Sequence, residues 1–195
     1  MRRHQSGVTL VEVLVSMVIM ALGLVSLAAL QNFTLRYQLG SVHRAQLSGL
    51  LSDYAERVRS NLGQAPGVAA TSSQVSYLVA DDWDAQKTDP VVTTSCSGSG
   101  ACTDLQLVTA DMQEWRSRVR RELPRGSVYV AGDAIQGLTV TFMWSDKEFV
   151  ASAGGDARKA LQCEASDTGL AEQTCCPKGA NAPEGVRCAT FSIIP

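Results

Sequence analysis

A single carboxylate stands inside a long apolar run near the start of the chain. Glu12 is the only charged residue among the 23 residues from Val8 to Leu30. An ionisable side chain in such surroundings is costly unless a partner neutralises it, which makes Glu12 a candidate functional group. The alternative is that the side chain extends to the edge of the apolar region, where water solvates its charge.

Cysteine is the second residue type whose chemistry matters, and all the cysteines lie far beyond the apolar run. An even number on one side of an apolar segment indicates disulfides formed in an oxidising compartment. Only five residues separate Cys96 from Cys102, so we expect a local disulfide between them. The six cysteines are Cys96, Cys102, Cys163, Cys175, Cys176 and Cys188.

The other four cysteines must pair among themselves. Cys175 and Cys176 are adjacent, and because a bond between neighbours is strained, each should pair elsewhere. Their partners are Cys163 and Cys188, in an order that the sequence leaves open. A zinc site is disfavoured, because there is no C-x-x-C pair and no histidine nearby.

Residues suited to catalysis or to nucleic-acid binding are scarce. His43 is the only histidine beyond the first seven residues, and no Ser/Lys or paired-carboxylate motif is present, so we expect no enzyme, cofactor or metal. The acidic cluster Asp81–Asp84 lacks a glycine-centred loop and is interpreted as a solvated turn instead of a calcium site. The basic run Arg116–Arg125 has no interleaved aromatics beyond Trp115, so we interpret it as a solvated helix face. A net charge of −2 also makes nucleic acid an unexpected partner.

The apolar run is long enough to cross a membrane, for which about 20 residues suffice. Arg2 and Arg3 precede it, and every cysteine follows it. The positive-inside rule and the oxidising compartment therefore agree on one topology: a single pass through a membrane, with the N-terminus in the cytoplasm and the remainder outside it. The run is too long for an ordinary secretory signal, and no small-residue cleavage site follows Leu30.

A helical pattern continues past the apolar run and stops at Gly63 and Pro66. The helix should be apolar all round over residues 8–30 and amphipathic over 31–62, where it should lie along a folded domain of residues 63–195. The apolar positions of the amphipathic part are Leu35, Leu39, Val42, Leu47, Leu50, Leu51, Tyr54, Val58 and Leu62.

A second helix is predicted to start at Thr103, where T-x-x-Q is a capping-box pattern, and to end before Pro124. Opposite charges four residues apart predict ion pairs of Glu114 with Arg118 and of Arg118 with Glu122. The apolar stripe of this helix comprises Val108, Met112, Trp115, Val119 and Leu123.

Three strands are predicted at Ser127–Ala131, Leu138–Ser145 and Arg187–Ile194, from their β-branched and aromatic residues. Gly132-Asp133 predicts a turn that makes the first two an antiparallel pair. The stretch Val75–Ala80 fits either a short strand or a helical turn. The predicted fold class is α+β, with a long N-terminal helix packed on a small antiparallel sheet.

The start of the chain resembles the class III signal of type IV pilins and pseudopilins, with a leader ending in Gly7 followed by VTLVEVLVSMVIMALGL. In that family a prepilin peptidase cuts after the glycine and methylates the new N-terminus. The resemblance implies cleavage between Gly7 and Val8 and methylation of Val8. It places Glu12 at the fifth mature position, where the family has its glutamate. The chain departs from the family in having valine instead of phenylalanine at position 8, and it lacks the proline that many major pilins carry in this helix.

The resemblance also implies a role for Glu12. Cleavage leaves a free amine at Val8, which can neutralise the Glu12 carboxylate of a neighbouring subunit, or of its own, in a staggered bundle of helices. Such a pair sets the register of the helices more than it stabilises them.

A later part of the chain is similar to the minor pilins called type IV pilus modification protein V. The similar residues are a cysteine pair, the segment DMQEWRSRVRRELPRGSV and the strand LTVTFMW. The likeness implies a minor pilin that acts in type IV pilus biogenesis and, through the pilus, in adhesion and twitching motility at the cell surface. Its partners would be major and minor pilins through the N-terminal helix, the prepilin peptidase, and the inner membrane before assembly. A type II secretion pseudopilin and a membrane-anchored periplasmic binding module are the alternatives.

Overall fold

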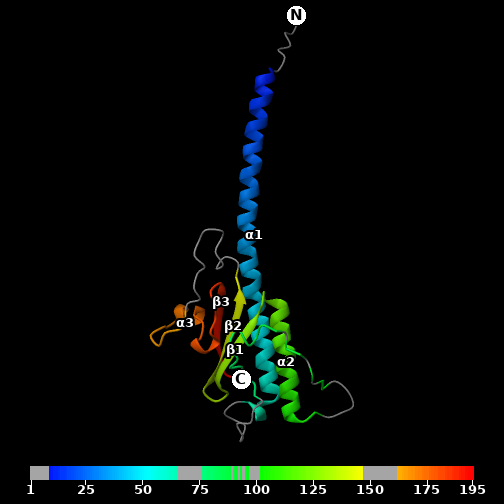
Figure 1. The fold of residues 1–195 in the computed structure, drawn as a ribbon, viewed down its shortest axis with the longest axis vertical. Coiled ribbons are helices and arrows are strands. Elements are labelled where there is room, and N and C mark those ends of the chain that lie inside the picture. Colours follow the sequence, from blue (N-terminus) through cyan, green and yellow to red (C-terminus); the bar gives the residue numbers. More distant parts are fainter. Residues whose placement is uncertain are drawn as a thin grey trace, which may run out of the picture. The chain divides into compact units, whose positions relative to one another are not determined.

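The computed structural model describes residues 9–65, 76–88, 90–91, 93, 95–96, 102–146 and 162–195, apart from the side chains of residues 36, 37, 39 and 40 (Figure 1). The chain divides into two compact units, Met1–Arg44 and Ala45–Pro195. The first helix, α1 (Leu10–Ser60), contributes to both. The predicted α+β class, with a long N-terminal helix and an antiparallel sheet, is confirmed.

Helix α1 is continuous over 51 residues, as expected for a stretch that contains no proline. It ends within two residues of the predicted position and is followed by a short 3-10 turn, η1 (Leu62–Gln64). The predicted amphipathic stretch is buried only in its later part, since Leu35 and Val42 are about half exposed and the side chain of Leu39 is not among those described. The buried residues of α1 are Leu47, Leu50, Tyr54, Ala55 and Val58.

Helix α2 (Asp104–Glu122) begins with the predicted capping box. The Gln106 amide donates to Thr103 Oγ1 at 3.3 Å, and the Thr103 amide donates to Gln106 Oε1 at 2.9 Å. These two bonds satisfy amides that a helix start would otherwise leave without partners. All five residues of the predicted apolar stripe are buried, so this helix turns one face to the core.

The sheet has three antiparallel strands in the order β1 (Ser127–Asp133), β2 (Gly137–Ser145) and β3 (Val186–Ile193). All three strands were predicted, but the predicted position of the turn, Gly132-Asp133, was wrong. Strand β1 continues through Asp133, whose Oδ1 accepts bonds from the amides of Ile135 (2.8 Å) and Gln136 (2.6 Å) and so closes the turn three residues later. Gly132 allows this extension, because a Cβ there would stand 2.3 Å from the Gly137 carbonyl oxygen.

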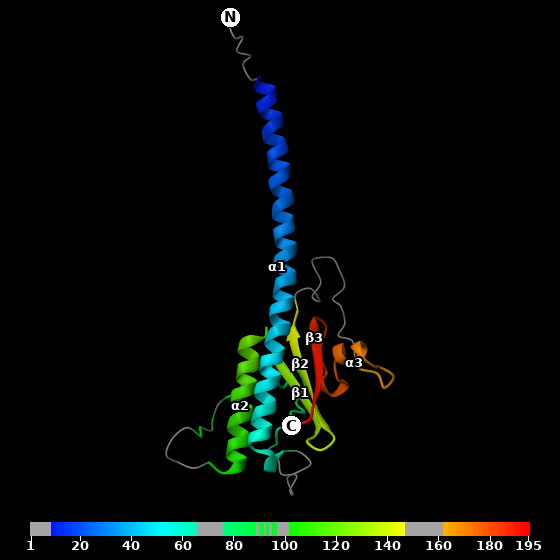
Figure 2. The ribbon, with the colours of Figure 1, turned by 180° about the vertical axis from the view of Figure 1, so that it is seen from behind.

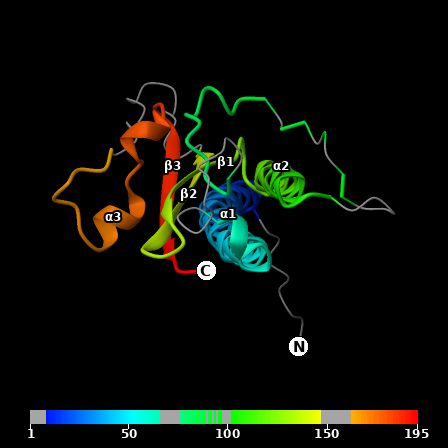
Figure 3. The ribbon, with the colours of Figure 1, turned by 90° about the horizontal axis from the view of Figure 1, so that it is seen from below.

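The sheet is covered on both faces, which explains why most of β2 is buried. Alternate residues of β2, such as Val140 and Phe142, face the cluster formed with α1 and α2. Met143 faces the opposite way and packs with Trp83 and Cys188. Within the unit Ala45–Pro195, the last turns of α1 lie beside α2 on one side of the sheet, and the short helix α3 (Leu170–Thr174) lies on the other (Figures 2 and 3).

A row of aromatic rings joins α1, α2 and the sheet. The rings of Tyr54 and Trp115 lie 4.7 Å apart, and Trp115 contacts Phe142 edge-on at 6.0 Å. Trp115 Nε1 donates to the Leu50 carbonyl of α1 at 2.9 Å, so the indole joins the two helices through both its ring and its polar atom.

Charged side chains form a second link between α1 and α2. Arg57 contacts the carboxylates of Asp53 (3.0 Å), Asp111 (3.1 Å) and Glu114 (3.2 Å). Burial lowers the pKa of Arg57, but the carboxylates of Asp53 and Glu114 outweigh it and raise the pKa overall. The predicted ion pair of Arg118 with Glu122 forms at 2.6 Å. The predicted pair of Glu114 with Arg118 does not form, because Glu114 pairs with the Arg57 guanidinium of α1 instead.

The outer edge of β1 is occupied by two separate groups. Val79 exchanges both backbone hydrogen bonds with Val130, at 2.9 and 3.2 Å. The stretch Val75–Ala80, predicted as a short strand or a helical turn, therefore contributes an isolated β-bridge at Val79, and Val75 itself lies outside the described residues. The buried Gln86 side chain pairs with Val128, donating to its carbonyl at 2.8 Å and accepting from its amide at 3.2 Å. A side-chain amide therefore takes the place of a neighbouring strand at this position.

Replacing Trp115 by phenylalanine tests the link between α1 and α2. We expect the free energy of unfolding to fall by about 2 kcal/mol, because the change removes a hydrogen bond and leaves a small cavity. Denaturant unfolding of the full chain in detergent micelles, followed by near-ultraviolet circular dichroism, measures this loss. Leu105→Ala, at a partly exposed position of the same helix, should change the free energy by less than about 0.5 kcal/mol. Equal losses in the two variants would contradict the role given to the indole.

Candidate functional site

The N-terminal part of α1 presents an apolar surface that the described residues leave uncovered. The segment Leu10–Leu35 is long and apolar enough to cross a membrane by length and composition, and none of it is buried. At about 1.5 Å per residue it extends roughly 39 Å. Its large apolar side chains are between 44% (Val13) and 79% (Leu10) exposed. A continuous apolar surface of this length is rarely exposed to water. The segment needs lipid or other protein around it.

Hydroxyl groups along this segment are satisfied by the helix itself. Ser16 donates to the Glu12 carbonyl at 2.7 Å, Ser26 to the Leu22 carbonyl at 2.9 Å, and Thr34 to the Leu30 carbonyl at 2.8 Å. Each bond runs back one turn, so the hydroxyls need no partner from water or from another chain. This arrangement suits surroundings that offer no hydrogen bonds.

The carboxylate of Glu12 differs from these hydroxyls. It is exposed in the first turn of α1 and makes no ion pair with any residue that the structure describes. Its backbone amide donates to the Thr9 carbonyl at 3.1 Å, and the start of a helix favours a negative charge. Gly7 and Val8 lie outside the described residues, so the cleavage and methylation expected there stay predictions.

Three disulfides brace the described part of the unit Ala45–Pro195. Cys96 bonds to Cys102, and the order that the sequence left open is Cys163 with Cys175 and Cys176 with Cys188. The adjacent cysteines thus serve two different bonds.

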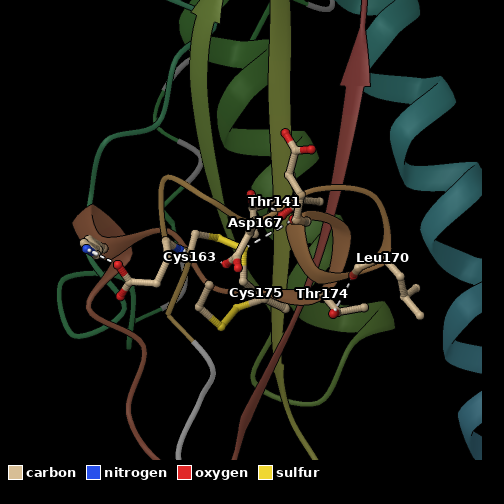
Figure 4. Close-up of a disulfide and its surroundings, with 12 residues drawn as sticks. Thr141, Cys163, Asp167, Leu170, Thr174 and Cys175 are labelled. Atoms are coloured by element: carbon tan, nitrogen blue, oxygen red, sulfur yellow. Dashed lines mark hydrogen bonds and ion pairs between the residues drawn. A yellow bond between two sulfur atoms is a disulfide. The ribbon is translucent and has the colours of Figure 1, made fainter.

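The two neighbouring disulfides fasten one loop to the sheet. Cys176 reaches Cys188 in β3, while Cys175 reaches back to Cys163 beside the short helix α3 (Figure 4). The Cys163 amide also donates to the Cys176 carbonyl at 3.0 Å. Five residues of helix would hold this loop weakly, so the covalent bonds are the main restraint on it.

The acidic cluster is used within the fold. Asp81 pairs with Arg116 at 3.1 Å, Asp84 pairs with Lys87 at 2.9 Å, and Asp82 Oδ1 accepts from the Ala85 amide at 2.8 Å. Over the described ranges, no three histidine, cysteine, aspartate or glutamate residues are placed to hold a metal ion.

The basic run on α2 makes contacts within the fold as well. Arg116 pairs with Asp81, and Arg118 pairs with Asp53 at 3.1 Å. Arg120 donates to the main-chain carbonyls of Gln86 and Lys87. These contacts hold the turn that follows Val79 against α2. The role of Gln86 was not predicted, because no local pattern identifies a glutamine whose side chain pairs with the backbone of a distant strand.

Comparison with known families identifies a motif in the N-terminal segment. Residues 2–28 match the family model described as the prokaryotic N-terminal methylation motif, and the match includes Glu12. The methylation motif therefore covers residues 2–28, which include the start of the apolar segment Leu10–Leu35. No curated protein and no solved structure matches the chain.

Removing each neighbouring disulfide separates their contributions. Cys176→Ala with Cys188→Ala should lower the free energy of unfolding by about 3 kcal/mol, since this bond closes a short loop and packs with Trp83 and Met143. The matched double variant, Cys163→Ala with Cys175→Ala, removes a disulfide that closes a loop of the same length but lies outside that cluster. Its free energy of unfolding should therefore fall by less. Denaturant unfolding without reductant measures both, and a larger loss for the second pair would contradict this ranking.

Proposed function

We propose that this chain is a minor pilin of a type IV pilus. The observation that carries the proposal is Glu12, an acidic side chain without an ion-pair partner among the described residues, within a segment that matches the methylation motif. The hydroxyls along the same segment are satisfied by its own backbone. The carboxylate is thus the group that calls for a partner from elsewhere.

Processing supplies a suitable cation. Cleavage between Gly7 and Val8 creates an α-amine, whose ordinary pKa near 8 leaves it largely protonated at neutral pH. Methylation keeps the amine basic, so its charge survives the modification. Val8 lies four residues before Glu12, a spacing that puts both on one face of a helix. The amine can therefore meet the Glu12 carboxylate of its own chain or of a neighbour.

The environment makes this pairing selective. An unpaired carboxylate among apolar helices is costly by several kcal/mol, whereas a paired one is tolerated. A subunit that enters the bundle at the wrong axial position leaves both its N-terminal amine and its Glu12 carboxylate unpaired. The ion pair therefore selects one axial position for each helix, and the apolar side chains of Leu10–Leu35 pack against those of neighbouring helices.

The rest of the chain fits an extracytoplasmic location. Three disulfides are typical of the periplasm and the cell surface. Before assembly the apolar helix holds the subunit in the inner membrane, with the N-terminus in the cytoplasm and residues 63–195 in the periplasm. After assembly the globular part is carried on the pilus, where it serves adhesion or twitching motility as a structural component and not as an enzyme.

A type II secretion pseudopilin is the second candidate, because the methylation motif belongs to both kinds of protein. The similarity of Asp111–Val128 and Leu138–Trp144 to type IV pilus modification protein V favours the pilus. Deleting the gene in the bacterium that encodes the chain distinguishes them. Loss of surface pili and twitching with normal protein secretion supports the pilus, and the reverse result supports the secretion system.

Processing is tested by co-expression with a prepilin peptidase. We expect intact-mass spectrometry to show the loss of residues 1–7 and the gain of one methyl group at Val8. Gly7→Val should block cleavage, because the glycine is the residue that the motif places before the cut. An unprocessed N-terminus in the native chain would rule out both the pilin and the pseudopilin.

The pairing role of Glu12 is tested by substitution without loss of processing. Glu12→Ala should still be cleaved but should enter pili at least about tenfold less well, since one unpaired buried amine costs more than 1.4 kcal/mol. Glu56→Ala, which removes an exposed carboxylate from the same helix, is the matched control. Quantitative immunoblotting of sheared pili gives the measurement. Normal incorporation of Glu12→Ala would contradict the ion-pair role while leaving the processing result intact.

A further inference from the structure

A narrow polar cleft lies where α2 turns into β1. Its volume is about 20 Å³, which is room for a single water-sized atom. Ser127, Gln86 and Trp83 are buried and form its base. The exposed side chains of Lys87 and Arg125 form its rim, and Arg120 completes the lining.

The base of this cleft contains a hydroxyl that lacks a partner. Ser127 is 4% exposed, and among the described residues its Oγ is the only buried side-chain nitrogen or oxygen without a hydrogen bond. Burying a hydroxyl without a partner costs about 1–3 kcal/mol. The neighbouring Gln86 shows the contrast, because its amide bonds to both Asp81 and Val128. The free hydroxyl at Ser127 points to a ligand that accepts a hydrogen bond there.

The rim of the cleft holds an arginine in an unusual backbone conformation. Arg125 has a φ of +54°, in the left-handed region that residues other than glycine rarely adopt. Gly126 is required at the next position, since a Cβ there would stand 2.5 Å from the Val119 carbonyl oxygen. The turn Leu123–Gly126 therefore keeps a strained arginine at the rim, and its side chain makes no ion pair with any described residue.

Neighbouring groups fix the shape of the cleft and add to its positive charge. Arg120 donates to the carbonyls of Gln86 and Lys87, which holds the wall of the cleft against α2. Lys87 Nζ lies 2.9 Å from Asp84, but both side chains are well exposed, so the pair is weak and can be shared with another anion.

We propose that this cleft binds an oxyanion, a carboxylate or a phosphate group, by one of its oxygens. The cleft admits one oxygen atom, which accepts a hydrogen bond from the Ser127 hydroxyl, while the remaining oxygens stay at the rim within reach of Arg125 and Lys87. A bound water would satisfy Ser127 but would not use the arginine at the rim, whose charge-assisted bonds favour an anion. The proposal is independent of pilus assembly and concerns the single subunit.

Nuclear magnetic resonance of the full chain in detergent micelles tests the proposal. Inorganic phosphate and acetate are titrated separately at constant ionic strength, with sodium chloride as the reference salt. We expect saturable shifts of the Gly126 and Ser127 amide signals with at least one of the two anions. Saturation with phosphate alone identifies a phosphate site, and saturation with acetate identifies a carboxylate site. Shifts that do not saturate, or that chloride reproduces, would overturn the proposal.

Substitutions locate the binding and separate it from a structural role. Arg125→Gln should weaken binding about tenfold, the effect of losing one charge-assisted bond, whereas Arg121→Gln removes a charge from α2 outside the cleft and should have little effect. Ser127→Ala should weaken binding without lowering the unfolding midpoint in the absence of anion, because the hydroxyl has no partner to lose. Arg125→Gly should raise that midpoint by relieving the backbone while abolishing the saturable shift. Unchanged binding in Arg125→Gln and Ser127→Ala would also overturn the proposal.

Discussion

The unit Ala45–Pro195 depends on the burial of the last turns of α1. Leu47, Leu50, Tyr54 and Val58 supply one wall of its core, and Trp115 and Arg57 join that wall to α2. The sheet has an apolar face that must be buried against another layer, and α1 with α2 supplies that layer, so the helix is a necessary part of the domain. The same helix continues into the apolar segment, so a single hydrogen-bonded element serves the core and the membrane-suited surface.

Local patterns in the sequence were sufficient for the two long helices and the three strands, but not for the short helix α3. The absence of proline, the T-x-x-Q cap and the alternation in Leu138–Ser145 each act over a few residues, and each was correct. One error is local: Asp133 Oδ1 accepts from the amides of Ile135 and Gln136, which moves the hairpin turn to Ala134–Gln136. The other concerns a contact between distant residues, since Glu114 pairs with Arg57 of α1 and not with Arg118. The disulfide order likewise required three-dimensional positions.

The candidate sites differed in how far the sequence could reveal them. Glu12 was conspicuous because a lone charge in an apolar run violates a simple rule. Ser127 carries no such signal, since a serine at the start of a strand is ordinary until its surroundings are known. The two residues nonetheless share one property, an unmet requirement for a partner. In Glu12 the requirement concerns charge, and in Ser127 it concerns a hydrogen bond.

The closed edge of β1 has a consequence for subunits held close together. Exposed strand edges pair readily with strands of other molecules, and crowding increases that tendency. Here Val79 and Gln86 already use the backbone groups of Val130 and Val128. A neighbouring copy therefore cannot extend the sheet through these residues. Strand addition at Val128 and Val130 is blocked, which protects this part of β1 from the edge-to-edge pairing that leads to aggregation.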